Sequence, residues 1–277
     1  MLEYNFADEA WSDTVDRLLL EGSLSHEGKI CIYGNAIKIV NAEHALVMNP
    51  ARSVNIWDSI FQLLSVVKGF ASGASDFSKQ FTREYKRFYK ECTSCECRKS
   101  GIFFDCCDLK NNEGLFFCVL DSGRVNLVFH IAQVDVWEDL PSLLFVHSAL
   151  QYMISEAIGA EVGELCVSAN TWYCSKGIRE ELATCRLSYV NLFPVYGFNT
   201  KDQALANLLL SGKQLHKKSS FCKAIDANNP KPALLGGSFI EDCYRLALIK
   251  NRSVGKSFID DCKSLALVKM VKARNDI

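Results

Sequence analysis

The sequence lacks any apolar run long enough to cross a membrane, and its net charge is close to zero. A membrane-spanning helix needs about 18 or more consecutive apolar residues, and none of the 277 residues belongs to such a run. The first residues, Met1-Leu2-Glu3, are not typical of a secretion signal. With 49% hydrophobic and 23% charged residues, the composition is that of an ordinary globular protein. We therefore expect a cytoplasmic protein with no membrane partner and no cofactor.

Cysteine, by contrast, is abundant, with 13 residues. Without a secretion signal these are expected to be reduced thiols, most of them small hydrophobic core residues. One cluster has spacing typical of metal ligands: Cys92, Cys95 and Cys97, with Cys106 or Cys107 as a fourth ligand. Because zinc prefers four ligands and no second Cys-x-x-Cys pair is present, this cluster is either a zinc site or a group of free thiols in a turn.

The net charge of −1 hides an asymmetry. The last 66 residues, 212–277, contain 13 Lys/Arg and 6 Asp/Glu, whereas residues 1–211 contain 18 and 26. A basic tail on an acidic body indicates separate roles, the docking of one part on another, or an ordinary solvated surface.

The stretch from Gly123 to Gly177 has the clearest pattern of secondary structure. An apolar run at 125–131 predicts a strand, a long apolar run at 142–158 predicts a buried helix, and a second strand begins at Cys166. Two residues suit the two ends of this helix: Pro141 and Gly159. Upstream, the spacing predicts a helix at 8–21 with these residues on one face: Trp11, Val15, Leu18 and Leu19.

Three further segments have readable patterns. Residues 29–40 predict two short strands around a Gly34-Asn35 turn. The segment 51–54 leads into a predicted helix that runs from about Ile56 to Gly69, and another helix is predicted over 76–92. A strand is predicted at 102–108.

The order strand, Asp135-Val136-x3-Leu140-Pro141, long helix, Gly159-x-Glu161-Val162-Gly163-Glu164, strand resembles the core of the thymidylate synthase and pyrimidine hydroxymethylase family. The resemblance implies an α/β (α+β) fold, with a mixed sheet and a long buried helix in residues 1–200. It also implies a homodimer in which sheet packs against sheet. Alternating apolar residues would support this packing: Leu115, Phe117, Val119, Val125, Leu127 and Phe129.

The resemblance places the family's functional positions on residues that mostly cannot perform the family's chemistry. Gln62 stands at the glutamate that polarises the pyrimidine, and Asn111 or Asn112 at the nucleophilic cysteine. Other positions are changed as well: Leu24 and Ala132 at phosphate arginines, Gln133 at the phosphate serine, Leu143 at the base-reading asparagine, and Trp172 and Cys174 at the ribose contacts. Asp135 is kept. Arg98 and Lys99 are either a phosphate contact or a solvated basic pair at a strand start.

Residues 201–277 lie beyond the resemblance and predict a basic helical region. A motif repeats within it, at 238–250 and again at 257–269, and each copy begins with a capping-box-like Ser-Phe-Ile-Glu or Ser-Phe-Ile-Asp. Two such helices suit a hairpin that packs on the main domain or on a protein partner. A nucleic-acid contact is the other interpretation.

We therefore expect a catalytically silent thymidylate synthase-like protein that acts as a dimeric scaffold or interaction protein. Two alternatives remain open. One is a divergent pyrimidine nucleotide-modifying enzyme or nucleotide sensor, with Cys106 or Cys107 reactive. The other is a nucleic-acid-binding module that uses the basic tail. Family members are frequent in DNA-modification pathways of bacterial viruses, so the resemblance also implies a viral setting.

Overall fold

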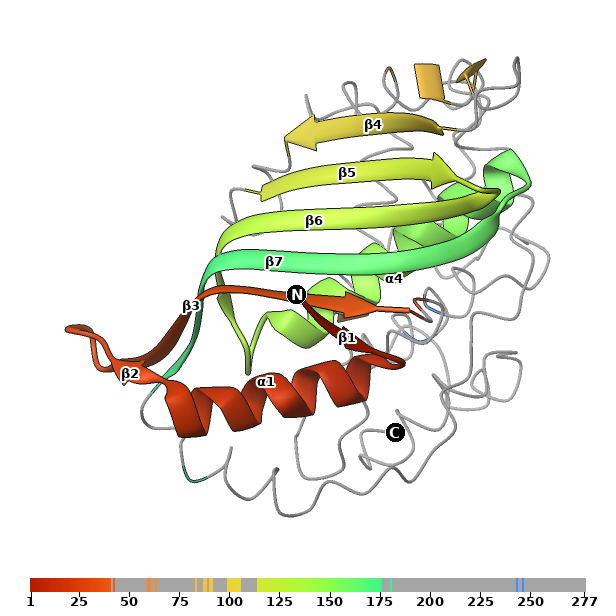
Figure 1. Cartoon of the computed structure of the whole chain (residues 1–277). Helices are drawn as coiled ribbons and strands as arrows, with labels where there is room; N and C mark the ends of the chain where they lie inside the picture. The colour runs from red at the N-terminus through yellow and green to blue at the C-terminus, as the bar shows by residue number, and fades with distance from the viewer. Residues whose placement is uncertain are drawn as a thin grey trace.

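The computed structural model describes residues 1–40, 42, 59, 60, 63, 83, 87, 88, 90, 91, 99–105, 114–175, 180, 243 and 246. Within these residues a seven-stranded mixed sheet carries two helices, α1 (Ala7–Glu21) and α4 (Leu140–Ile158) (Figure 1). The strands are β1 (Leu2–Tyr4), β2 (Ser23–Leu24), β3 (Lys29–Ile39), β4 (Lys99–Asp105), β5 (Gly114–Asp121), β6 (Arg124–Asp135) and β7 (Glu161–Ser175). The mixed α/β class predicted from the sequence is confirmed.

The sheet order is β1-β3-β7-β6-β5-β4, and β2 pairs with β3 beside this path. The pairs β1–β3 and β6–β7 are parallel, and the other pairs are antiparallel. Ser122 and Gly123 join β5 to β6 with φ angles of 53° and 80°. Positive φ at both central residues is the geometry of the tight hairpin turn that matches the twist of antiparallel strands. The parallel pair β6–β7 is joined through α4, as a crossover connection requires.

Both helices lie against one face of the sheet. α4 contacts β6 and β7, and α1 contacts β3 and α4 (Figure 1). Alternate residues of β6 point toward α4 and are almost fully buried: Val125, Leu127, Phe129 and Ile131. The expectation that Val125, Leu127 and Phe129 line a sheet-to-sheet dimer contact is therefore wrong, because the alternation of the strand turns them toward the helix.

The Gly34-Asn35 pair does not reverse the chain as predicted. β3 runs without interruption past Gly34, and the pairs Tyr33↔Thr171 and Asn35↔Ala169 keep one register. Gly34 nevertheless has φ 63°, a conformation that favours glycine. Gly34 therefore causes an irregularity within the single strand β3, where the sequence predicts a turn between two strands.

In three neighbouring strands the alternation of buried residues shifts by one position at this level. In β3 the buried side shifts from Ile37 and Asn35 to Ile32 and Ile30. The same change occurs between Ile131 and Val134 in β6, and between Ala169 and Trp172 in β7. All three strands curve together in Figure 1. The bend brings the first part of β3 and the last parts of β6 and β7 toward α1.

The amphipathic helix α1 closes this end of the core. Its buried residues are Ala7, Ala10, Trp11, Thr14, Val15 and Leu18, and Leu19 is only half-buried. The Trp11 indole donates a hydrogen bond of 2.9 Å to the Val136 carbonyl and lies 5.9 Å from the Trp137 ring. Trp11 therefore links α1 to the segment between β6 and α4.

Isolated residues of other predicted helices are helical: Ser59, Ile60 and Leu63, then Arg83, Arg87, Phe88, Lys90 and Glu91, and finally Cys243 and Leu246. The rest of these helices, the second repeat at 257–269 and the strand predicted beyond Asp105 lie outside the described residues. In the part of the chain that is described, no helix is both long enough and apolar enough to cross a membrane.

Candidate functional site

Asp135 stands at the end of β6, where the chain turns toward α4. Its Oδ1 accepts hydrogen bonds from the backbone nitrogens of Trp137, at 2.8 Å, and Glu138, at 3.0 Å. Its own carbonyl accepts a third bond from the Asp139 nitrogen, at 2.9 Å. The carboxylate thus satisfies backbone donors of a turn, as Asp does before a helix. This role accounts for an aspartate at this position without a ligand.

Trp172 lies on the neighbouring strand, β7, in register with Val134 of β6. Its side chain is 0% exposed, and its indole nitrogen donates a hydrogen bond of 3.0 Å to the Asn35 carbonyl of β3. Cys174, two residues further along β7, is also fully buried. The two positions at which the resemblance implies ribose contacts therefore lie in the buried core.

The structure brings Asp135 and Trp172 to neighbouring strand ends, because Asp135 pairs with Tyr173. Leu143 is buried in α4, and Leu24 is exposed on β2. Lys99 is the first residue of β4, and only its backbone is described. The remaining predicted site residues lie outside the described residues: Gln62, Cys92, Cys95, Cys97, Arg98, Cys106, Cys107, Asn111 and Asn112.

A second polar cluster, which the sequence does not predict, lies at the opposite end of β6 and β7. The register shifts between Val125↔Val162 and Leu127↔Leu165, so Gly163 and Glu164 both face Asn126. The Asn126 side-chain oxygen accepts a hydrogen bond of 2.8 Å from the Glu164 nitrogen. This side chain therefore replaces a bond that the bulge removes from the ladder.

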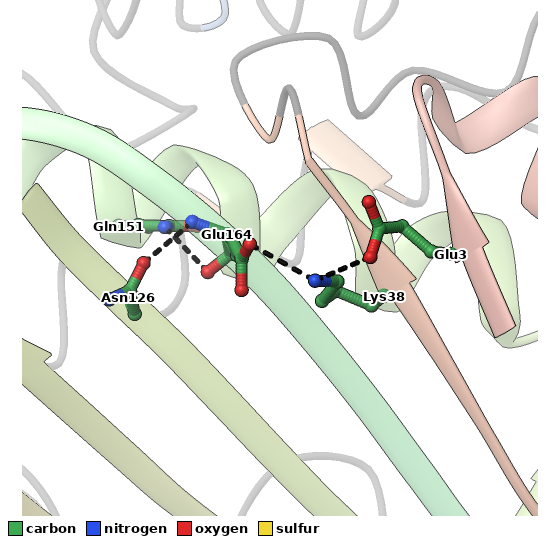
Figure 2. Close-up of polar contacts among 5 residues, drawn as sticks. All are labelled: Glu3, Lys38, Asn126, Gln151 and Glu164. Carbon is green, nitrogen blue, oxygen red and sulfur yellow. Dashed lines mark hydrogen bonds and ion pairs between the residues drawn. The ribbon is translucent and has the colours of Figure 1, made fainter. Parts of the chain in front are cut away.

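Gln151 of α4 supports the same bulge from the core side. Its Nε2 donates to the Val125 carbonyl at 2.7 Å. It also donates to the Glu164 carbonyl at 3.0 Å (Figure 2). The side chain is fully buried. One amide thus connects the helix to both parallel strands where their ladder is irregular.

On the other face of the sheet, Lys38 of β3 lies between two carboxylates (Figure 2). Its Nζ is 2.6 Å from Glu3 Oε2 of β1 and 3.1 Å from Glu164 Oε1 of β7. The hydrogen bonds to Glu3 and then to Glu164 raise the pKa of Lys38 above its ordinary value. We call these three residues the Glu3–Lys38–Glu164 triad. It joins three strands and leaves one excess negative charge.

His147 is a buried titratable group of α4. Its ring lies 4.0 Å from the Phe129 ring, centroid to centroid, and Nδ1 is 2.7 Å from the Leu143 carbonyl. Nδ1 must carry the proton in this contact, because a carbonyl only accepts. Burial lowers the pKa of His147 to about 4, so the imidazole is neutral at physiological pH.

These groups can stabilise the fold, but they do not form a catalytic arrangement among themselves. Among the described residues, no three His, Cys, Asp or Glu side chains lie close enough together to hold a metal. Asp135 is bound to backbone donors, and the carboxylates of the triad are neutralised in part by Lys38. Gln151, an amide within an apolar helix, was the one sequence signal that could have revealed the bulge cluster.

Comparison with known proteins assigns no family. No family model matches the sequence, and no curated protein has a significant match to it. The thymidylate synthase resemblance therefore remains a hypothesis that depends on the order of strands, the long buried helix and the motif residues.

Proposed function

We propose that this chain is a catalytically silent protein of thymidylate synthase-like architecture that acts as a homodimeric interaction protein. In this proposal residues 201–277 contact a protein partner. The mixed sheet and the long helix that connects the parallel strands β6 and β7 agree with the architecture that the resemblance implies.

The observation that carries the proposal is the burial of Trp172. A nucleotide ribose needs hydrogen-bonding side chains exposed in a cavity, whereas this indole is 0% exposed and its only donor is bound to the Asn35 carbonyl at 3.0 Å. Asp135 supports the same conclusion, because its Oδ1 is used by the backbone nitrogens of Trp137 and Glu138. Asp135, the family residue that this chain keeps, thus has a role in folding that is enough to explain its presence.

Titration of the full chain with dUMP and dCMP tests this function. We expect no saturable heat by calorimetry and no ligand-detected NMR signal with nucleotide at about 1 mM, which corresponds to less than about 4 kcal/mol of binding free energy. Saturable binding that is lost in Gln62→Ala would contradict the proposal and favour the nucleotide sensor or divergent enzyme. Cys106→Ser and Cys107→Ser would then be compared for loss of turnover.

The alternative function, nucleic-acid binding, is tested by a separate measurement of DNA binding. Binding of the full chain to duplex DNA would have to weaken steeply with salt, because counterion release dominates such contacts. We expect no salt-dependent binding at physiological ionic strength. A steep salt dependence would instead assign the basic tail to nucleic acid.

A further inference from the structure

The helix α1 carries an excess of negative charge. Its 15 residues contain one cation, Arg17, and five carboxylates: Asp8, Glu9, Asp13, Asp16 and Glu21. Asp8 and Glu9 lie in the first turn, where the helix dipole favours negative charge. Asp13 accepts a hydrogen bond from the Tyr4 hydroxyl, and Glu21 Oε2 lies 3.5 Å from Arg17 Nη2. The helix dipole and these contacts account for four carboxylates, and Asp16 is the fifth.

Asp16 points away from the sheet, and yet it is half-buried. With 3.6 residues per turn, it lies about 160–180° around the helix axis from Ala7, Thr14 and Leu18, which are each 0% exposed. The elements that α1 contacts, β1, β3, β7 and α4, lie on the side of those buried residues (Figure 1). The Oδ1 atom of Asp16 is nevertheless buried. A further interaction is therefore present at Asp16, on the outward side of α1.

The cation of the same helix is directed to other groups. Arg17 Nη1 donates to Asn35 Oδ1 at 2.7 Å, and Arg17 Nη2 donates to Glu21 Oε2 at 3.5 Å. Burying a carboxylate oxygen is costly unless a cation or hydrogen-bond donors replace the lost water. Compensation for Asp16 is therefore expected from a basic segment elsewhere in the chain.

Residues 212–277 are the basic segment, with 13 Lys/Arg and 6 Asp/Glu, an excess of seven positive charges. Two residues of this basic region are described, Cys243 and Leu246, and both are helical and 0% exposed. Residues three positions apart lie on the same face of a helix. This part of the basic region is therefore packed within the folded chain and is not a solvated tail.

We propose that the basic region 212–277 docks on the outward side of α1 in the same chain, where one of its Lys or Arg residues pairs with Asp16. The charges are complementary, since α1 has an excess of four negative charges and the region an excess of seven positive ones. The inference goes beyond the proposed function, because the contact lies within one chain and leaves the other sides of the region for a protein partner. Docking also occupies cations that a nucleic acid would otherwise contact.

Carbodiimide coupling of the full chain tests this contact, because it joins a carboxylate directly to a lysine amine that touches it. Mass spectrometry of the digested product identifies the joined peptides. The Glu3–Lys38 pair, with atoms 2.6 Å apart, is the internal control. A mixture of unlabelled and isotope-labelled chains separates coupling within one chain from coupling between two chains. We expect α1 to be joined to a peptide from 212–277 of the same chain.

Charge reversal measures the contribution of Asp16. We expect Asp16→Lys to lower the Tm of the full chain by about 3 °C or more, because a lysine at this position repels the basic region. Glu21→Lys is the matched control on the same helix, since the Glu21 side chain is 59% exposed and exposed ion pairs contribute little. We expect this control to change the Tm by less than about 1 °C.

The outcomes test the docking separately from the proposed function, which depends on nucleotide binding. Coupling of α1 only to peptides outside 212–277, only between two chains, or to no peptide while Glu3 couples to Lys38, overturns the docking. An Asp16→Lys variant that unfolds no earlier than Glu21→Lys overturns Asp16 as the paired carboxylate. If Asp16→Lys does not fold, the coupling result of the wild-type chain decides.

Discussion

The side-chain oxygen of Asn126 fills the space beside Gly163. A Cβ placed on Gly163 would lie 2.2 Å from that oxygen and 2.8 Å from the Val125 carbonyl. Contacts this short do not occur in folded proteins, so the bulge of β7 accepts only glycine here while Asn126 holds the Glu164 nitrogen. Two residues that are far apart in the sequence therefore determine one local geometry.

This relationship predicts that Gly163→Ala is destabilising. We expect a loss of about 1–3 kcal/mol in the free energy of unfolding, because Asn126 must move and lose its bond to Glu164. Urea unfolding measures the loss. In the double variant with Asn126→Gly the steric conflict with the side chain is removed, so the two changes should cost less together than their sum. Additive losses would show that the Asn126 side chain does not cause the conflict.

Gln151→Leu is predicted to lower the free energy of unfolding, although the apolar surroundings of Gln151 would accept a leucine. Leucine fits an apolar helix, but the Val125 and Glu164 carbonyls would lose the donor that both use. We expect a loss of about 2–3 kcal/mol in the free energy of unfolding. Ser155→Ala on the same helix is the matched control, because it removes one buried donor to a helix carbonyl and should cost about 1 kcal/mol. Equal losses in both variants would contradict the bridging role.

Stability is predicted to fall as the pH is lowered through weakly acidic values. Burial lowers the pKa of His147 to about 4 in the folded protein, whereas an unfolded histidine titrates near 6.5. Between these values the unfolded chain binds more protons, so acid favours unfolding, and the loss approaches about 3 kcal/mol near pH 4. Chemical unfolding at pH 7.5, 6, 5 and 4 measures this dependence. His147→Phe removes the group, and an unchanged pH profile in that variant would assign the acid sensitivity to other residues.

The sequence was informative where a pattern is local. The helices predicted at 8–21 and 142–158 are observed at Ala7–Glu21 and Leu140–Ile158, because helical periodicity of apolar residues is determined within each segment. The Gly34-Asn35 turn was predicted wrongly, since a glycine with positive φ serves a bend within a strand as well as a hairpin. The triad had no local signal. Lys38 and Glu164 are 126 residues apart, and only the pairing of β3 with β7 brings them together.

Asp135 provides the sharpest distinction between a folding role and a ligand role. Asp135→Asn keeps the side-chain oxygen that accepts from the Trp137 and Glu138 nitrogens, so we expect little change in the free energy of unfolding. Asp135→Ala removes this acceptor and should cost about 1 kcal/mol, as for other side-chain caps of backbone donors. Thermal and urea unfolding of both variants measures the difference. If Asn and Ala are equally neutral for stability, the carboxylate has no role in the turn. Its negative charge would then need another explanation, such as a bound ligand.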